Sequence, residues 1–446
     1  MAKQTPNSEI LAASKRSKDG RTPKSAWLVS ALLDWFAANA RDLPWRRTRD
    51  PYAIWVSEIM LQQTQVKTVL PYWKRWMREL PTIKAVANAS PDKIHKLWEG
   101  LGYYTRARNL QKAAREIVEK HGGKFPQHFD DVLALPGIGR YTAGAICSIA
   151  FNQPMPILDG NVIRVLTRIF GIGKNPLEKR TNEQLWKLAE ELVVHASRIT
   201  YHASRPSTRT RTKDENEDDS ANSHVNQSLM ELGALVCLPR NPLCPVCPVK
   251  KFCVAFRENR VEELPNLGHR ATTTARHFIA FIVEQTGRFL VRQRPAGVVN
   301  AHLWEFPNVE IGARLTEPQH ADSKVNPLRV TDPRSGAVAE TAVQIFGIKP
   351  KEISPLCTVK HSITRYRITL EAWHVNPGGT SYTSPHSKPV NSGTRIARPS
   401  KSGVWLTHAQ MQQLAFTAAH RKILHVLAAT GRPHCAVRSS AFRRPA

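Results

Sequence analysis

The sequence predicts a multidomain chain, with an all-α part followed by an α+β part, on three observations. Between Ser25 and Cys253, apolar residues recur at three- and four-residue spacing, with Pro and Gly between the runs, as in amphipathic helices. After about residue 276 the pattern changes to short strand-like runs separated by turns. The chain of 446 residues is also long enough for two or three domains, each with its own core.

Individual elements follow from the same patterns. The expected helical segments include residues 27–36, 54–69, 92–98, 107–120, 162–170 and 185–194. The expected strands are residues 277–283, 288–294, 365–374 and 404–406, and a further helix is expected at 418–428.

Domain boundaries follow from shifts in composition. The expected parts are a disordered basic tail (1–24), a helical domain (25–260), a linker (261–275), an α+β domain (276–430) and a second disordered basic tail (431–446). Residues 197–223 are rich in Ser, Thr, Arg, Asp and Glu and nearly free of large apolar side chains. Such a segment cannot bury enough apolar surface to fold, so we expect a disordered insertion in the helical domain.

The charge balance indicates a polyanionic partner. Lys and Arg number 64 against 36 Asp and Glu, a formal net charge of +28. Each phosphate that a cation neutralises releases counterions, which favours nucleic-acid binding, although a generically basic soluble protein would have the same composition. No apolar run is long enough to cross a bilayer, and residues 1–23 lack the hydrophobic stretch of a secretory signal. We therefore expect no membrane association and a cytoplasmic location.

The cysteines indicate a metal centre. Of seven cysteines, four lie close together, at Cys237, Cys244, Cys247 and Cys253. Clustered thiolates bind soft metal centres, and this spacing alone leaves zinc and an iron–sulfur cluster both open. The cations Arg240, Lys250 and Lys251 lie between the cysteines, so we expect this loop to contact phosphates.

A Pro-Gly-x-Gly turn joins two predicted helices at residues 135–140. Its two glycines permit a tight turn that exposes backbone N–H groups to a phosphate. Taken alone, such a turn is most often a simple connector. The helix that follows it favours a helix-hairpin-helix, whose expected DNA contacts are Pro136, Gly137, Gly139 and Arg140.

Two carboxylates stand in positions suited to chemistry. Glu58 lies within an otherwise apolar helical run, where an acid is costly unless it is paired or used, and where its pKa should rise toward that of a general acid. A paired structural Glu is the alternative. Asp159 and Asn161 lie just before the helix expected at 162–170, where Asp159 could also be only an N-cap.

Together these motifs resemble the MutY-type adenine DNA glycosylases of the endonuclease III superfamily. The matching segments, in the family's order, are residues 55–66, 100–109, 135–140, 158–161 and 226–233 and the cysteine spacing, within a resemblance that covers about residues 25–430. The resemblance implies a helix-hairpin-helix glycosylase core with a 4Fe-4S cluster loop, followed by an α+β Nudix-like domain. It further implies a monomer of base excision repair that acts on double-stranded DNA containing adenine mispaired with 8-oxoguanine or guanine.

The resemblance also assigns roles to residues in the core. Glu58 would protonate adenine N7, while Asp159 would stabilise, or transiently bond to, the oxocarbenium-like sugar, as in retaining glycoside hydrolysis. Tyr141 and Asn161 would position these groups. Cys237, Cys244, Cys247 and Cys253 would hold the cluster, in a structural role.

Two further residues match positions that the family uses against DNA. Gln63 and Tyr103 would wedge into the duplex and stabilise its distortion. The related endonuclease III family has a nucleophilic lysine where this chain has Tyr141, which implies a monofunctional glycosylase here.

The second half resembles the Nudix-like domain with which MutY proteins recognise 8-oxoguanine. Residues 294–307 fit that domain, whereas residues 335–344 keep one acid of a glutamate-rich magnesium-binding helix, so nucleotide hydrolysis is not expected. Ile363, Thr364 and Arg365 stand where many relatives have a Phe-Ser-His loop against the lesion, although they could form only a turn between strands.

Two alternatives from other functional classes remain at this stage. A non-enzymatic iron–sulfur protein that binds DNA or senses redox state would have no need of Glu58 or Asp159. A nucleotide-pool hydrolase would need the acidic helix that is missing.

Overall fold

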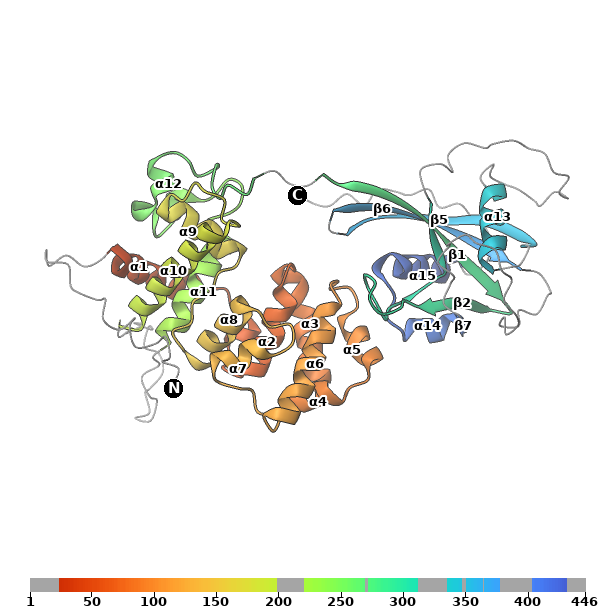
Figure 1. Cartoon of the computed structure of the whole chain (residues 1–446), viewed down its shortest axis with the longest axis horizontal. Helices are drawn as coiled ribbons and strands as arrows, with labels where there is room; N and C mark the ends of the chain where they lie inside the picture. Colours follow the sequence, from red (N-terminus) through yellow and green to blue (C-terminus); the bar gives the residue numbers. More distant parts are fainter. Residues whose placement is uncertain are drawn as a thin grey trace, which may run out of the picture. The chain divides into compact units, whose positions relative to one another are not determined.

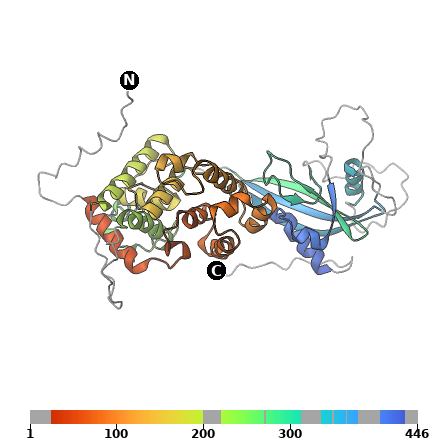
Figure 2. The same cartoon turned by 90° about the horizontal axis from the view of Figure 1, so that it is seen from below.

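The structure, a computed structural model, is described for residues 24–198, 220–268, 272–311, 335–346, 350–363, 365–377 and 403–430. The predicted tail 431–446, all but Lys24 of the predicted tail 1–24, and most of the predicted insertion 197–223 lie outside these residues. Contacts divide the chain into two compact units, Met1–Asn88 with Asn109–Arg270 and Ala89–Arg108 with Ala271–Ala446. Figures 1 and 2 show the helices of the amino-terminal half and the sheet of the carboxyl-terminal half.

The amino-terminal half is helical, as predicted. Its elements are α1 (Lys24–Asn39), η2 (Pro44–Arg46), α2 (Pro51–Leu61), α3 (Val66–Glu79), α4 (Ile83–Asn88), α5 (Pro91–Trp98), α6 (Thr105–Lys120), α7 (Phe129–Ala134), α8 (Arg140–Phe151), α9 (Gly160–Phe170), α10 (Lys179–Ala196), α11 (Ala221–Leu235), η3 (Cys244–Val246), η4 (Lys250–Phe252) and α12 (Val254–Arg257). No helix among the described residues is both long and apolar enough to cross a membrane.

Two helices of this half are enclosed by the others. In α2, every residue from Tyr52 to Met60 is buried. Helix α11 packs with α1, α9 and α10 around a core that includes Leu32, Leu166 and Leu229. A helix that is buried all round has no solvent face on which to place a charge. Any acid on α2 or α11 therefore has to find a partner inside the protein.

The helical run predicted at residues 54–69 is wrong as a single element, because it forms two helices. Helix α2 ends at Leu61, and Gln63 has a φ of +54°, in the left-handed region that a continuous helix cannot use. Helix α3 begins at Val66. The apolar spacing continues through the break, so periodicity alone could not locate it.

The predicted insertion is also too long at its carboxyl-terminal end. Residues 221–223 form the first turn of α11 and are buried. Asn222 Nδ2 donates to the carbonyl oxygen of Asn152 at 2.8 Å, and Ser223 N donates to Asn152 Oδ1 at 3.1 Å. These polar residues are buried because they cap the end of α8, which composition alone could not reveal.

The carboxyl-terminal half is built on one sheet. Its elements are β1 (Thr274–Gln285), β2 (Arg288–Gln293), β3 (Trp304–Glu305), β4 (Asn308–Ile311), α13 (Ser335–Phe346), β5 (Glu352–Ile363), β6 (Tyr366–Asn376), β7 (Gly403–Thr407), α14 (His408–Gln412) and α15 (Ala418–Thr430). The order is β3-β2-β1-β6-β5, with β4 paired to β1 and β7 paired to β2. The β1–β6 pair is parallel, and the remaining pairs of these strands are antiparallel.

Both faces of the sheet are covered. Successive side chains of β1 point to opposite faces, as a strand requires. Ile279 and Phe281 pack into a core with Val338 of α13, whereas Ala280 and Ile282 pack into a core with α14 and α15. This arrangement confirms the α+β prediction for the carboxyl-terminal half.

Strand β5 was not foreseen from the sequence. It contains Pro355, which cannot donate a hydrogen bond to a neighbouring strand, and the pairing shifts between Pro355 and Cys357. Because β5 lies at the edge of the sheet order, the missing donor costs little.

The predicted linker is partly folded. Leu264 is buried, and its carbonyl oxygen accepts a 2.8 Å hydrogen bond from Nε of Arg168 on α9. Residues 274 and 275 already belong to β1. The connection between the two folded halves is therefore shorter than composition suggested.

We predict that Gly144→Ala destabilises the protein, because Gly144 brings α8 against the segment before α9. A Cβ at this position would lie 2.4 Å from the carbonyl oxygen of Pro156. Overpacking of this kind typically costs about 1–3 kcal/mol. Urea unfolding measures this change in the free energy of unfolding. Gly160→Ala is the control, because a Cβ at that position meets nothing within 4 Å. Equal stability of the two variants would contradict this account of the packing.

Candidate active site

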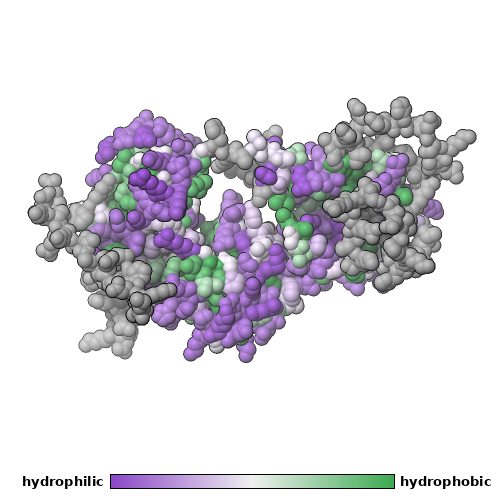
Figure 3. Space-filling view, viewed as in Figure 1, coloured by the Kyte–Doolittle hydropathy of each residue, from purple (hydrophilic) through white to green (hydrophobic). Residues whose placement is uncertain are grey.

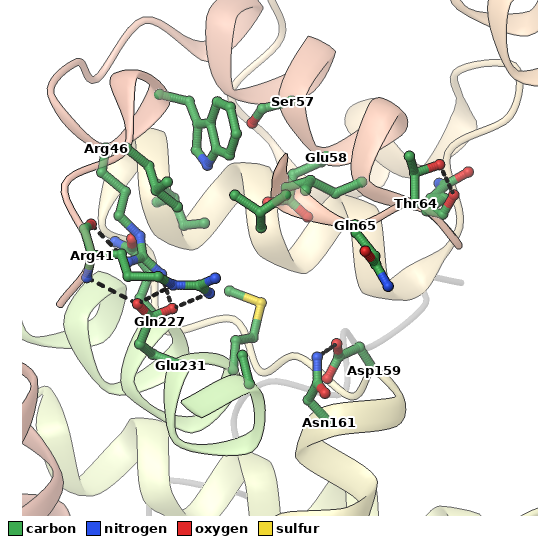
Figure 4. A pocket seen from close by; sticks show the side chains of 18 of the residues that line it. Arg41, Arg46, Ser57, Glu58, Thr64, Gln65, Asp159, Asn161, Gln227 and Glu231 are labelled. Carbon is green, nitrogen blue, oxygen red and sulfur yellow. Dashed lines mark hydrogen bonds and ion pairs between the residues drawn. The ribbon is translucent and has the colours of Figure 1, made fainter. Parts of the chain in front are cut away.

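One large pocket lies among the elements of the first unit. Its volume is about 940 Å³, and its lining includes Glu58, Tyr141, Asp159 and Asn161. Figure 4 shows Glu58 on α2 above Asp159 and Asn161 at the start of α9. The fold thus brings together four residues that the sequence singled out from three separate segments.

Glu58 is a buried acid with a neutral partner. Its side chain comes from the enclosed helix α2, and its Oε2 accepts a 2.8 Å hydrogen bond from the hydroxyl of Tyr141. Burial raises the pKa of Glu58 to about 7, and the Asp159 carboxylate adds to the rise, against smaller lowering effects of Tyr141 and Arg46. Glu58 can therefore carry a proton near neutral pH, as a general acid must.

Tyr141 is held in its protonated form. Burial and the nearby carboxylates raise its pKa well above the ordinary value, so its hydroxyl donates to Glu58 and does not ionise. Because Tyr141 is the second residue of α8, the hairpin before that helix also positions the partner of Glu58.

Asp159 both caps a helix and faces the pocket. Its Oδ1 accepts from the backbone N–H of Val162 at 2.7 Å, the N-cap bond of α9, and its Oδ2 accepts from Asn161 Nδ2 at 3.0 Å. Burial raises the pKa of Asp159, and these hydrogen bonds oppose the rise. The capping alternative is thus structurally true, but the carboxylate also lines the pocket.

A third buried acid was missed by the sequence analysis. Glu231 on α11 accepts from Nε and Nη2 of Arg41 at 2.8 and 2.7 Å, and from Nη2 of Arg46 at 2.8 Å. All three residues line the pocket, and Figure 4 shows the network beside it. Burial acts to raise the pKa of Glu231, but the two guanidinium groups outweigh it and lower the pKa to about 2. The sequence did contain a signal for Glu231, namely an acidic residue among apolar neighbours in a helix, which is the same signal that identified Glu58.

The hairpin lies between α7 and α8, with Pro136 in its turn. Gly137 has a φ of +79°, and a Cβ there would lie 2.6 Å from Cβ of Asn109, so this position requires glycine. Gly139 has an ordinary φ of −100° and open space around it, so its glycine is not needed for the turn itself. The guanidinium of Arg140 lies over the ring of Trp186, 4.0 Å from its centre.

Comparisons with known proteins decide the family. A family model described as "HhH-GPD superfamily base excision DNA repair protein" matches residues 56–191, and one described as "NUDIX domain" matches residues 278–426. Adenine DNA glycosylase of Rattus norvegicus is 32% identical in an alignment of 479 positions that covers 93% of this chain and 83% of that protein. Adenine DNA glycosylase of Homo sapiens is 32% identical over 450 residues, which cover 89% and 73%.

The chain belongs to the adenine DNA glycosylase family. It is therefore a DNA glycosylase, a hydrolase that cuts N-glycosidic bonds, and DNA is its partner. The predicted combination of a helix-hairpin-helix core and a Nudix-like domain is confirmed. Among solved structures, a thermostable thymine-DNA glycosylase aligns at 28% identity and a TM-score of 0.44, over 52% of this chain and 97% of that one.

The four clustered cysteines of this glycosylase line a second pocket. Its other walls include apolar side chains of α9 and α11, and Nη1 of Arg168 lies 3.4 Å from Sγ of Cys237. In the described parts of the chain, no three His, Cys, Asp or Glu side chains are grouped closely enough for a single metal ion. Four thiols around one pocket are the donor set of an iron–sulfur cluster, and also that of a structural zinc.

The cations expected to meet phosphates on this loop are exposed. Arg240, Lys250 and Lys251 all lie at the surface, and Nζ of Lys250 donates to the carbonyl oxygen of Pro245 at 2.9 Å. A loop that presents several exposed cations suits a DNA backbone.

Gln63 and Tyr103 share an unusual backbone geometry. Both are exposed, and both have positive φ angles, of +54° and +47°. Such conformations are uncommon outside glycine and cluster at functional sites. Both side chains are therefore held at the surface by a constrained backbone.

Of the residues expected to contact the lesion, Ile363 and Arg365 lie at the end of a hairpin. Ile363 ends β5 and pairs with Tyr366, the first residue of β6. Thr364 lies outside the described residues. The guanidinium of Arg365 lies over the ring of Tyr366, 5.2 Å from its centre.

In the described part of α13, Glu340 is the one acid, as the sequence indicated.

We predict that Glu231→Gln destabilises the helical unit at neutral pH by about 3 kcal/mol, because it leaves two guanidinium groups without their counter-ion. The lowered pKa adds a pH dependence. The ionised carboxylate stabilises the fold above its unfolded pKa of about 4.5, and that contribution is lost as pH falls toward about 2. Unfolding at several pH values measures both effects. The variant should lose less stability than wild type between pH 5 and 2, and parallel curves would contradict this assignment.

Proposed function

We propose that this glycosylase removes adenine from double-stranded DNA where adenine is mispaired with 8-oxoguanine or guanine, that it acts as a monomer, and that it does not efficiently cut the strand. The observation that carries the proposal is the protonatable Glu58, in the same pocket as the Asp159 carboxylate. The printed name of the relatives, adenine DNA glycosylase, supports adenine as the base.

The reaction would begin with adenine turned out of the duplex into the pocket. Extrusion costs a few kcal/mol, which Gln63 and Tyr103 would offset by filling the space left in the stack. The fixed carboxylate of Glu231, with Arg41 and Arg46, provides a polar wall for a base that has both donors and acceptors on its edges.

Bond cleavage would use the two remaining acids in different forms. Glu58 gives its proton to adenine N7, and the C1′–N9 bond breaks with its electron pair on the base. The Asp159 carboxylate, held by Val162 and Asn161, stabilises the positive charge on the sugar. Water then adds to C1′, and its proton passes to the Glu58 carboxylate, which restores the acid.

The proposed product is an abasic site in an intact strand. Tyr141 carries a phenol, which cannot form the imine through which a lysine would open the sugar. Lys67 is the one amine among the described residues that line the pocket, and it is exposed. A covalent complex trapped with borohydride would contradict the monofunctional assignment, and Lys67→Met would identify the amine.

The test of the proposed substrate is a single-turnover assay of the full chain. Duplexes carry adenine opposite 8-oxoguanine, guanine or thymine, and strands are analysed with and without alkali. We expect excision in the first two duplexes, fastest opposite 8-oxoguanine, and strand breaks that need alkali. Thr364→Ala should reduce the preference for 8-oxoguanine, with Arg365→Ala as a neighbouring comparison. Equal rates in all three duplexes would overturn the proposed specificity.

We predict that Glu58→Gln lowers the excision rate by at least about 10²–10⁴-fold while duplex binding changes little, because only the transferable proton is lost. Wild type has its own signature. The acid is active when protonated, so the single-turnover rate should fall as pH rises through about 7.

Asp159→Asn should also lose excision through lost charge stabilisation. If Asp159→Asn lowered only the melting temperature, its role would be that of a helix cap.

We also propose that Cys237, Cys244, Cys247 and Cys253 hold a 4Fe-4S cluster. When bound, the cluster would fix the basic loop that contains Arg240, Lys250 and Lys251. We predict about four irons per chain and broad absorption near 400 nm, both reduced in Cys244→Ser together with DNA affinity. Cys357→Ser, in the sheet domain, is the matched control and should keep its iron. Stoichiometric zinc in protein prepared anaerobically with ample iron would overturn the assignment.

A further inference from the structure

The segment from Trp98 to Arg106 contains an arginine placed between two aromatic rings. The guanidinium of Arg106, on the first turn of α6, lies 5.4 Å from the ring centre of Trp98 and 5.6 Å from that of Tyr103. Trp98 is fully buried, whereas Tyr103 is 46% exposed. Arg106 thus connects an exposed aromatic side chain to one that is anchored in the protein. Cation–π contacts gain strength where the cation is partly removed from water.

The same guanidinium also holds the backbone of the loop. Nη2 of Arg106 donates to the carbonyl oxygens of Leu101 and Gly102, both at 3.2 Å. The carbonyl oxygen of Gly102 accepts a second hydrogen bond, at 3.1 Å, from Nε1 of Trp98. Side chains on both sides of the loop therefore fix the peptide that immediately precedes Tyr103.

The loop needs such support because its backbone is strained. Gly100 and Gly102 have φ angles of +108° and +75°, and Tyr103, which has a Cβ, follows at +47°. Non-glycine residues in the left-handed region cost about 1–3 kcal/mol and persist where surrounding contacts hold them there. Arg106 supplies two of the hydrogen bonds that hold this loop, beside those made by the side chains of Trp98 and Tyr104.

The guanidinium of Arg106 is half-buried but keeps its charge. Burial lowers its pKa to about 10, so it remains a cation at neutral pH. Its guanidinium faces rings and carbonyl oxygens of the protein, and a lysine could not make the same planar contacts with both.

We propose that Arg106 is a positioning residue that holds the Tyr103 ring in the orientation in which it inserts into the duplex. Arg106 itself needs no contact with DNA for this role. The proposal rests on the proposed function, in which Tyr103 is a wedge. A ring that is oriented before binding does not have to be ordered during base extrusion, so Arg106 lowers the cost of that step.

A double-mutant cycle on the full chain tests the proposal. Extrusion is followed by the fluorescence of 2-aminopurine placed at the target adenine opposite 8-oxoguanine, with duplex affinity and melting temperature measured in parallel. We expect Arg106→Ala to slow extrusion about ten- to a hundredfold. A displacement of about 1 Å in a positioned group can reduce a rate by up to about a hundredfold. Arg106→Lys should recover part of the rate, since it keeps the charge without the planar hydrogen bonds. In a Tyr103→Ala background, Arg106→Ala should have little further effect on extrusion.

The matched control is Arg115→Ala on the same helix. Nε of Arg115 donates to the carbonyl oxygen of Ala87 at 3.1 Å, a hydrogen bond of similar length away from Tyr103. This variant should leave extrusion unchanged even if it lowers the melting temperature. A merely structural arginine at position 106 would slow extrusion by the same factor with and without Tyr103, and that result would overturn the proposal. If Arg106→Ala does not fold, Arg106→Lys takes its place in the cycle.

Failure of the proposed function gives a different result. If Tyr103→Ala alone leaves extrusion unchanged, Tyr103 is not a wedge. Both the proposed role of Tyr103 and the positioning role of Arg106 are then wrong. If Tyr103→Ala slows extrusion but Arg106→Ala does not, the wedge stands and only the positioning role of Arg106 is wrong.

Discussion

The burial of Glu58 on the enclosed helix α2 is the constraint on which the candidate site depends. A carboxyl group taken out of water in this way is more stable when protonated, and a protonated acid near neutral pH is what N-glycosidic bond cleavage requires. The hydrogen bond from Tyr141 keeps the group in place without supplying a positive charge that would ionise it. Packing of α2 against α8 therefore sets both the position and the protonation state of Glu58.

Three acids around one pocket show how environment divides the roles of similar side chains. Glu58 has a neutral partner and a raised pKa, whereas Glu231 has two guanidinium partners and a lowered one. Asp159 takes hydrogen bonds from a helix N-terminus and an amide, which favour its carboxylate against burial. A protonated Glu58, an ionised Asp159 and an ionised Glu231 can then line the same cavity. Hydrogen bonds stabilise the charge of Asp159, and two guanidinium groups stabilise that of Glu231.

Left-handed backbone conformations occur where this glycosylase is expected to meet DNA. Gln63 ends the α2 segment, Tyr103 ends the loop before α6, and Gly137 lies in the hairpin, all with left-handed φ angles. Two of these turns are packed against neighbouring groups, Gly137 against Asn109 and Tyr103 against Arg106. These turns lie next to the ends of helices, where a few exposed groups are placed to meet the duplex.

Much of this protein was determined by the sequence alone. Local spacing identified the helices, most strands, the hairpin, the cysteine cluster, and Glu58 and Asp159 as candidate acids, because each signal lies within a few neighbouring residues. Only the tertiary structure decided what depends on distant residues. It broke the run 54–69 at Gln63, moved residues 221–223 into a buried helix, and placed β5 with its proline at the sheet edge. It also brought Glu231 to Arg41 and Arg46, more than 180 residues away, and Tyr141 to Glu58. The protonation state of each acid follows from its burial and from its distant partners, and no local pattern contains either.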